Sequence, residues 1–252
     1  MKKIIWTIIL VLSLAIAGTT AYIITTNMMD DGDKAEYVDK PAAATKSAEE
    51  LKKYAENHKI KWDKLKKTNK DIYAWLYVPK TKIDYPVVQP SKNKDDLYYL
   101  NRDIDKKYKF AGSIFSEKMN AKDFKDPVTV LYGHNMLNGS MFAGLHRFEI
   151  ASFFKKNKVF YIYTPSRRLT YQIYSAYTYD DRHIMNSFDF GDKADLKEYQ
   201  KSTLKPKSMT KNVRKVKLNS KSKIVTLSTC TNGDDNTRFL VQGVLVKDEA
   251  AK

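Results

Sequence analysis

One thiol dominates the chemistry that this sequence offers. Cys230 is the only cysteine among 252 residues, and it ends the apolar run 224–230, which is typical of a buried strand. A lone cysteine forms no internal disulfide, so it is an inert core residue, an intermolecular linker or a nucleophile. A thiol attacks a carbonyl carbon only as the thiolate, and a nearby imidazole can take or share its proton.

Two further residues complement this thiol. Acyl transfer develops an oxyanion, which needs fixed positive charge or N–H donors. His134 follows an apolar run and Gly133, so it stands at a strand end where it can project over a cleft. Arg238 opens the next apolar run after Cys230, and residues 231–237 are short enough for a hairpin that places both at one rim. Taken alone, these residues fit either acyl transfer or a buried cysteine beside an ion-paired arginine.

The other three histidines have weaker settings. His58 falls on a helical apolar stripe and is expected to be packed, whereas His146 and His183 are expected to be solvated or structural. One cysteine and scattered histidines lack the spacing of a zinc site. We therefore expect no metal and no cofactor.

The first 29 residues predict a membrane anchor. Lys2 and Lys3 precede the uncharged stretch 4–29, and a bilayer core of about 30 Å needs a helix of roughly 20 residues. Lysines before the span and acids after it predict a cytoplasmic N-terminus and an extracellular remainder. The competing interpretation is a cleaved signal peptide with its cleavage site near the small residues of 15–21. Both interpretations place the rest of the chain outside the membrane.

The exported part is long enough for one domain and is strongly basic. Without Lys2 and Lys3, 43 of the 45 basic residues face 29 acidic ones, a net charge of +14. This charge fits a solvated lysine-rich surface or attraction to anionic envelope polymers or lipid headgroups. The location and the lack of a binding motif argue against nucleic acid. A single thiol retained in an oxidising location favours a chemical role for that thiol.

Beyond a linker at 30–46, the chain predicts one helix and then a β-domain. Ser47 and Glu50 have the spacing of a capping box, and apolar residues at helical intervals predict a helix over 48–68. Eight short β-like runs follow and predict a closed barrel or a sandwich. They are 72–78, 82–88, 112–116, 127–133, 158–164, 168–179, 223–230 and 237–247.

Two helices and one long strand complete this expectation. One helix begins near Ser140, and another over 193–204 is capped by Asp192. Residues 168–179 alternate as expected for one long strand. One face of this strand is expected to carry Leu169, Tyr171, Ile173 and Ser175. The other face is expected to carry Thr170, Gln172, Tyr174 and Ala176.

Three segments in order resemble the sortases, the cysteine transpeptidases of Gram-positive surfaces. Thr-Leu-Ser-Thr-Cys at 226–230 resembles the active-site signature of that family. Leu-Tyr-Gly-His-Asn at 131–135 resembles its histidine segment, and Arg-Phe-Leu-Val-Gln-Gly at 238–243 resembles its arginine strand. The resemblance covers roughly residues 48–247.

Class B sortases are the most similar group. Their traits here are the helix at 48–68, Tyr-Tyr-Leu-Asn at 98–101, Gly-Ser-Ile-Phe at 112–115 and the helix before the cysteine strand. The resemblance implies a mainly β fold: a closed eight-stranded barrel with an N-terminal helix, short helices in loops and an N-terminal transmembrane helix. It also implies a catalytic domain over 47–252, divided into a helix at 47–70 and a barrel at 71–248.

The resemblance further implies the reaction and its partners. Cys230 attacks the carbonyl of the threonine in a C-terminal sorting motif, His134 protonates the leaving amine, and Arg238 stabilises the oxyanion. The backbone N–H of Thr231 is a second oxyanion donor. The expected substrates are surface proteins with Asn-Pro-x-Thr or Ser/Pro-Pro-x-Thr-Gly motifs, and a peptidoglycan precursor or cross-bridge amine accepts the acyl group. The alternatives are a thiol peptidase that releases to water and a non-enzymatic basic wall-binding module.

Period-two spacing extends the predicted site. Tyr132 and Ser228 lie two residues before the catalytic candidates on their strands, so both are expected to line the substrate groove; packing at the barrel rim is the alternative. Some class B members carry an acidic residue soon after the cysteine, where this chain has Thr231 and Asn232. No third carboxylate is assigned, and Asn135 or solvent is expected to orient the imidazole instead.

Overall fold

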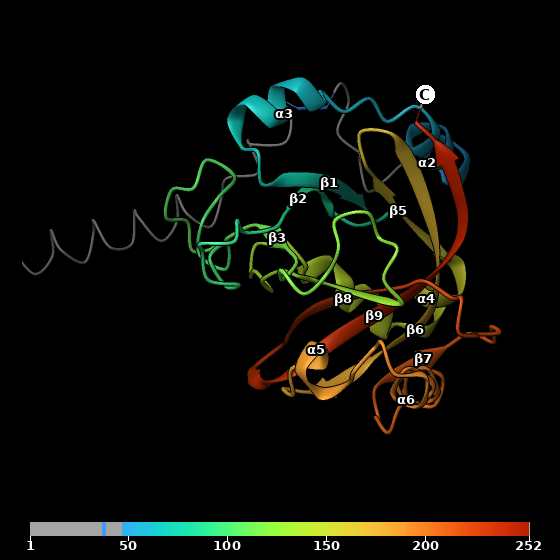
Figure 1. Cartoon of the computed structure of the whole chain (residues 1–252). Coiled ribbons are helices and arrows are strands. Elements are labelled where there is room, and N and C mark those ends of the chain that lie inside the picture. Colours follow the sequence, from blue (N-terminus) through green and yellow to red (C-terminus); the bar gives the residue numbers. More distant parts are fainter. Residues whose placement is uncertain (1–36, 39–46, 252) are drawn as a thin grey trace, which may run out of the picture.

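A closed ring of strands forms the centre of the computed structural model, which describes residues 37–38 and 47–251 (Figure 1). Hydrogen-bonded neighbours follow the order β5-β1-β2-β3-β4-β8-β9-β6, and β5 pairs with β6 to close the ring of eight. The strands are β1 (Ile72–Tyr77), β2 (Asp84–Val88), β3 (Ile114–Phe115), β4 (Val128–Tyr132), β5 (Val159–Tyr163), β6 (Arg167–Asp180), β7 (Lys211–Val213), β8 (Ile224–Thr231) and β9 (Asp234–Ala250).

Because the ring is closed, the domain is a barrel and not a sandwich. All eight predicted runs form strands of the ring. The ninth strand, β7, was not predicted. It pairs only with β6, at the outer edge, and its three residues are mostly exposed, so no hydrophobic alternation marks it.

Short helices decorate the barrel. In Figure 1, α2 and α3 lie at the top and α6 at the bottom. The helices are α2 (Ala48–Glu56), α3 (Trp62–Thr68), the 3-10 helix η2 (Ala143–Glu149), α4 (Ala151–Lys156), α5 (Ile184–Ser187) and α6 (Lys193–Leu204). The capping box at Ser47 and Glu50 is confirmed, and α6 has its predicted bounds and its Asp192 cap.

The predicted single helix over 48–68 is wrong, because the chain forms two helices there. Asn57 ends α2: its backbone N–H and its side-chain amide both donate to the carbonyl of Lys53. Ile60 then forms an isolated β-bridge with Val38 before α3 begins. The break turns His58 toward the barrel, where its side chain is 1% exposed, so its predicted packed role is confirmed.

The predicted alternation of β6 holds only over its first half. Leu169, Tyr171 and Ile173 pack inward, but the pairing with β9 shifts between Ile173 and Ser175. Tyr174, within this bulge, packs outward as predicted, and its hydroxyl donates to Thr203 of α6 at 2.8 Å. After the bulge, Ala176 packs inward, against the prediction. A bulge inserts one residue and so exchanges the faces of a strand.

The predicted membrane anchor at 1–29 and all but two residues of the predicted linker at 30–46 lie outside the described residues. Among residues 37–38 and 47–251, no helix is both long enough and apolar enough to cross a bilayer.

Asp84 joins the N-terminal helices to the barrel. Its side chain is 8% exposed, and its two oxygens accept from Trp75 Nε1 at 2.7 Å and from the Tyr54 hydroxyl at 2.8 Å. The ring nitrogen Nε2 of His58 lies 3.0 Å from the same carboxylate. One buried carboxylate therefore satisfies donors from α2, from the segment after it and from β1.

Replacement of this carboxylate should undock α2. We expect Asp84→Ala to lower the free energy of unfolding by about 3 kcal/mol, because it leaves buried donors without an acceptor. Denaturant unfolding measures the loss. Asp63→Asn, on exposed α3 surface, is the control and should change the free energy by less than about 0.5 kcal/mol. Equal effects of the two variants would contradict the role given to Asp84.

Candidate active site

Strand pairing brings Cys230 and Arg238 together. They are direct partners in the antiparallel pairing of β8 with β9, so their side chains project from the same face of the sheet. Both are half-buried, and Arg238 Nη1 donates to the Thr237 carbonyl at 3.1 Å. The predicted hairpin is confirmed, and it places a thiol beside a permanent cation.

The parallel pairing of β4 with β8, extended beyond the end of β4, aligns His134 with Cys230. Each β4 residue pairs with the residue 96 positions later, from Val128 with Ile224 (224 − 128 = 96) to the end of β4. Carried two residues past that end, the same offset aligns His134 with Cys230 (230 − 134 = 96). Hydrogen bonding continues beyond the strand, because the Gly133 N–H donates to the Ser228 carbonyl at 3.2 Å.

A backbone carbonyl orients the imidazole of His134. Nε2 lies 2.8 Å from the carbonyl oxygen of Leu100, and a carbonyl only accepts, so Nε2 carries the proton. Nδ1 is then the nitrogen left to exchange a proton. The partner of this nitrogen is Leu100, and the expected partner Asn135 bonds Asn232 instead. The residue type at 100 gives no signal of this role, because any residue offers the same carbonyl.

Phe110 covers the same imidazole. The two rings stack with centroids 5.6 Å apart and planes 15° from parallel, although Phe110 itself is 56% exposed. Burial lowers the pKa of His134 below its ordinary value of 6.5, and the hydrogen bond to Leu100 offsets part of that effect. The neutral imidazole is therefore favoured.

The structure separates the predicted groove residues Tyr132 and Ser228 by exposure. They are direct partners across β4 and β8, but Ser228 is buried and Tyr132 is half-buried. The Tyr132 ring stacks on Phe115 and on His183, and its hydroxyl is buried without a partner among the described residues. Burial raises the pKa of that hydroxyl well above its ordinary value. The Tyr132 hydroxyl therefore stays protonated, and the side chain is uncharged.

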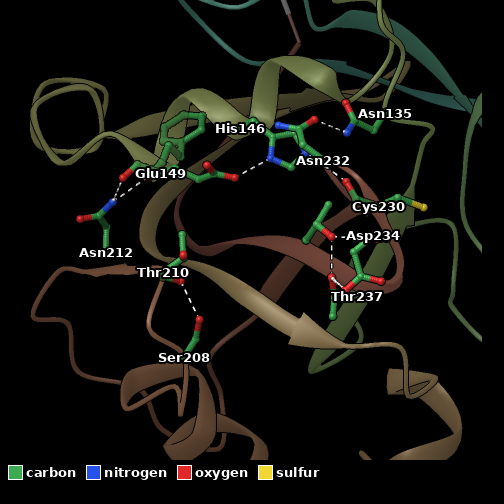
Figure 2. A network of polar contacts seen from close by, with 12 residues as sticks. Asn135, His146, Glu149, Ser208, Thr210, Asn212, Cys230, Asn232, Asp234 and Thr237 are labelled. Atoms are coloured by element: carbon green, nitrogen blue, oxygen red, sulfur yellow. Dashed lines mark hydrogen bonds and ion pairs between the residues drawn. The ribbon is translucent and has the colours of Figure 1, made fainter.

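The turn after Cys230 is joined to the histidine segment. Asn135 Nδ2 donates to Asn232 Oδ1 at 2.7 Å, so these two side chains bond each other (Figure 2). Thr231 Oγ1 donates to the Asp234 carbonyl at 2.8 Å, and its hydroxyl lies 2.5 Å from that of Thr237. The two predicted catalytic segments are therefore held by an amide–amide contact.

His146 is a neighbour of Cys230 that sequence reasoning missed. Its Nε2 lies 3.0 Å from the Cys230 carbonyl oxygen and its Nδ1 lies 2.6 Å from Glu149 (Figure 2). The side chain is 10% exposed, so the solvated alternative is wrong and a structural role is correct. The i, i+3 spacing from His146 to Glu149 was the only available signal.

A buried polar network holds β8, the strand that carries Cys230. The hydroxyl of Tyr199, on α6, lies 2.8 Å from Thr226 Oγ1, which donates to Gln242 Oε1 at 2.9 Å. Gln242 Nε2 completes the triangle at 3.2 Å from Tyr199. All three residues are at most 2% exposed, and buried networks of this kind fix relative positions. Helix α6 is thereby tied to β8 and β9. No metal-binding group of three His, Cys, Asp or Glu exists in the described part of the chain.

The profile of the sortase domain, a family of cysteine transpeptidases, matches residues 76–246, a range that includes His134, Cys230 and Arg238. The chain belongs to the sortase family. It is 34% identical to sortase B of Listeria monocytogenes over 184 residues, 72% of each protein. The crystal structure of Clostridium perfringens sortase B superposes with a TM-score of 0.65 at 33% identity, covering 74% of this chain and all of the other.

Two solved complexes are similar to the same extent. The complex of Staphylococcus aureus sortase B with a substrate has a TM-score of 0.64 at 30% identity, covering 73% of this chain and 84% of that one. A sortase B complexed with triglycine has a TM-score of 0.65 at 30% identity, covering 74% and 85%. The chain is thus a sortase B-like transpeptidase, and the non-enzymatic alternative is excluded.

The stacking of Phe110 on His134 leads to a prediction about the pH dependence of the reaction. Phe110→Ala exposes the imidazole to water, which stabilises its charged form and raises its pKa toward 6.5. Any limb of the pH–rate profile that reports deprotonation of His134 should move to higher pH. Peptide cleavage measured from about pH 5 to about pH 9 tests this shift. Tyr108→Ala, which removes a 68% exposed aromatic ring from the same loop, should leave the profile in place; a shift with that variant or none with Phe110→Ala would contradict the assignment.

Proposed function

We propose that this protein cleaves a C-terminal sorting motif after its threonine and transfers the surface protein to a cell-wall amine. The observation that carries the proposal is the pairing of Cys230 with Arg238. The register of β4 with β8, extended two residues past the end of β4, aligns His134 with the same pair. These three side chains supply a nucleophile, an oxyanion partner and a proton carrier at one rim.

The first half-reaction forms a thioester. Nδ1 of His134 takes the thiol proton, and the resulting Cys230 thiolate adds to the threonine carbonyl. The oxyanion is stabilised by Arg238 and by the N–H of Thr231. The tetrahedral intermediate collapses, the C–N bond breaks, and His134 gives its proton to the leaving amine. The threonyl acyl group remains on the sulfur. Tyr132 and Ser228, which share the face of these strands, line the path of the motif.

The second half-reaction runs in the reverse sense. An amine attacks the thioester, His134 takes its proton, and a new amide forms as the thiolate leaves. The structures of sortase B relatives with a substrate and with triglycine support motif and amine sites of this kind. We propose Asn-Pro-x-Thr or Ser/Pro-Pro-x-Thr-Gly motifs as substrates and a peptidoglycan precursor or cross-bridge as the amine.

The location follows from the first residues. We propose a single-pass anchor at 1–29 with a cytoplasmic N-terminus, a linker at 30–46 and an extracellular catalytic domain at 47–252. Its lysine-rich composition suits an envelope of anionic polymers.

Removal of the thiol tests the proposal directly. Cys230→Ala should abolish cleavage of fluorogenic peptides that carry the proposed motifs, because no other residue can form the thioester. The matched control is Asn236→Ala, an exposed side chain of the same hairpin, which should retain wild-type turnover. Retained cleavage in Cys230→Ala would disprove the mechanism.

Addition of an amine distinguishes transfer from hydrolysis. With triglycine at millimolar concentration, we expect turnover of the peptide to rise and mass spectrometry to detect the ligated amide, because the thioester partitions to the better nucleophile. Wild type without triglycine is the control. Hydrolysed product alone at every triglycine concentration would favour the thiol peptidase.

A further inference from the structure

His146 contacts the peptide bond that follows the proposed nucleophile. Its Nε2 lies 3.0 Å from the carbonyl oxygen of Cys230, 84 residues away in the chain. Figure 2 shows the carbonyl pointing toward the imidazole and the thiol pointing away from it. His146 therefore approaches Cys230 from the side opposite to the sulfur and does not compete with His134 for it.

Three contacts hold the imidazole of His146 in place. Glu149 lies 2.6 Å from Nδ1, and the ring stacks on buried Phe239 with centroids 5.1 Å apart. The Cys230 carbonyl only accepts, so Nε2 of His146 carries the proton that it donates, and the contact of Nδ1 with Glu149 fixes the orientation of the ring.

The Cys230 carbonyl and the Thr231 N–H belong to one peptide unit. A trans peptide is planar, so its carbonyl and its N–H point in opposite directions, and anchoring one aims the other. The regular pairing of β8 with β9 shifts between these two residues. At this shift a side-chain anchor replaces part of the orientation that an unbroken ladder provides.

We propose that His146 is a positioning residue for acyl transfer: it anchors the Cys230 carbonyl and thereby aims the Thr231 N–H at the oxyanion. This inference rests on the proposed function, in which Cys230 is the nucleophile. His146 exchanges no proton with the substrate. It contributes when negative charge develops on the attacked carbonyl oxygen, because a hydrogen bond to the carbonyl of a peptide strengthens donation by its N–H.

Steady-state cleavage of an Asn-Pro-x-Thr peptide tests the role. His146→Ala should lower kcat on the order of tenfold and leave KM within about twofold, since the lost interaction acts mainly on the transition state. His146→Gln, which keeps a neutral donor, should recover part of kcat. The matched control is Asn212→Ala: Asn212 donates to the Phe148 and Glu149 carbonyls, so its loss loosens η2 without removing the bond to Cys230.

Alkylation separates an oxyanion role from an effect on the thiol. Iodoacetamide is attacked by the sulfur at its CH2 group, iodide leaves, and no oxyanion forms. Cys230 is the only cysteine, so mass spectrometry follows it alone. We expect His146→Ala to be alkylated within about twofold of the wild-type rate while kcat falls on the order of tenfold.

Several outcomes would overturn the inference. They are an unchanged kcat in His146→Ala, a parallel loss of kcat and alkylation, and an equal loss of kcat in Asn212→Ala. If His146→Ala does not fold, His146→Gln carries the test. We expect kcat to fall about threefold, because the flexible amide holds the carbonyl less firmly than the stacked imidazole does; an unchanged kcat then refutes the role. Turnover by Cys230→Ala marks the distinct failure of the proposed function.

Discussion

The register between β4 and β8 is the constraint on which the site depends. A constant offset of 96 residues aligns the two strands, and the antiparallel partner β9 adds Arg238 opposite Cys230. A shift of one residue in either pairing would turn the side chain of Cys230 or Arg238 to the opposite face of the sheet from its partners. The barrel core and the network of α6 beneath β8 oppose such shifts, so packing far from the thiol determines whether the thiol has partners.

Around that frame, backbone carbonyls orient both imidazoles near Cys230. Leu100 accepts from Nε2 of His134, and the carbonyl of Cys230 contacts Nε2 of His146. The settings differ, because within the described part of the chain no carboxylate bonds to the ring of His134, whereas His146 has Glu149. Burial lowers the pKa of His134 and favours its neutral state, while Glu149 fixes the orientation of the His146 ring.

Much of the fold was predictable from patterns within single segments. All eight barrel strands and the cap of α6 follow from local alternation and capping residues, whose effects act over a few neighbours. The break in the helix over 48–68 and the bulge in β6 were not predictable, because each depends on a distant partner. His58 leaves its helix for Asp84 on β2, and the pairing of β6 with β9 shifts before Ser175, so that Ala176 packs inward.

The sequence by itself determined the chemistry on offer: one thiol, a histidine at a strand end, and an arginine at the start of the next strand. It also determined the family resemblance, because short motifs in a fixed order survive without knowledge of contacts. Only the tertiary structure decided which groups orient them. Leu100 and Cys230 act through carbonyls that every residue possesses, and His146 becomes a neighbour of Cys230 only because folding places η2 beside the end of β8. Interactions made through the backbone leave no mark on residue type.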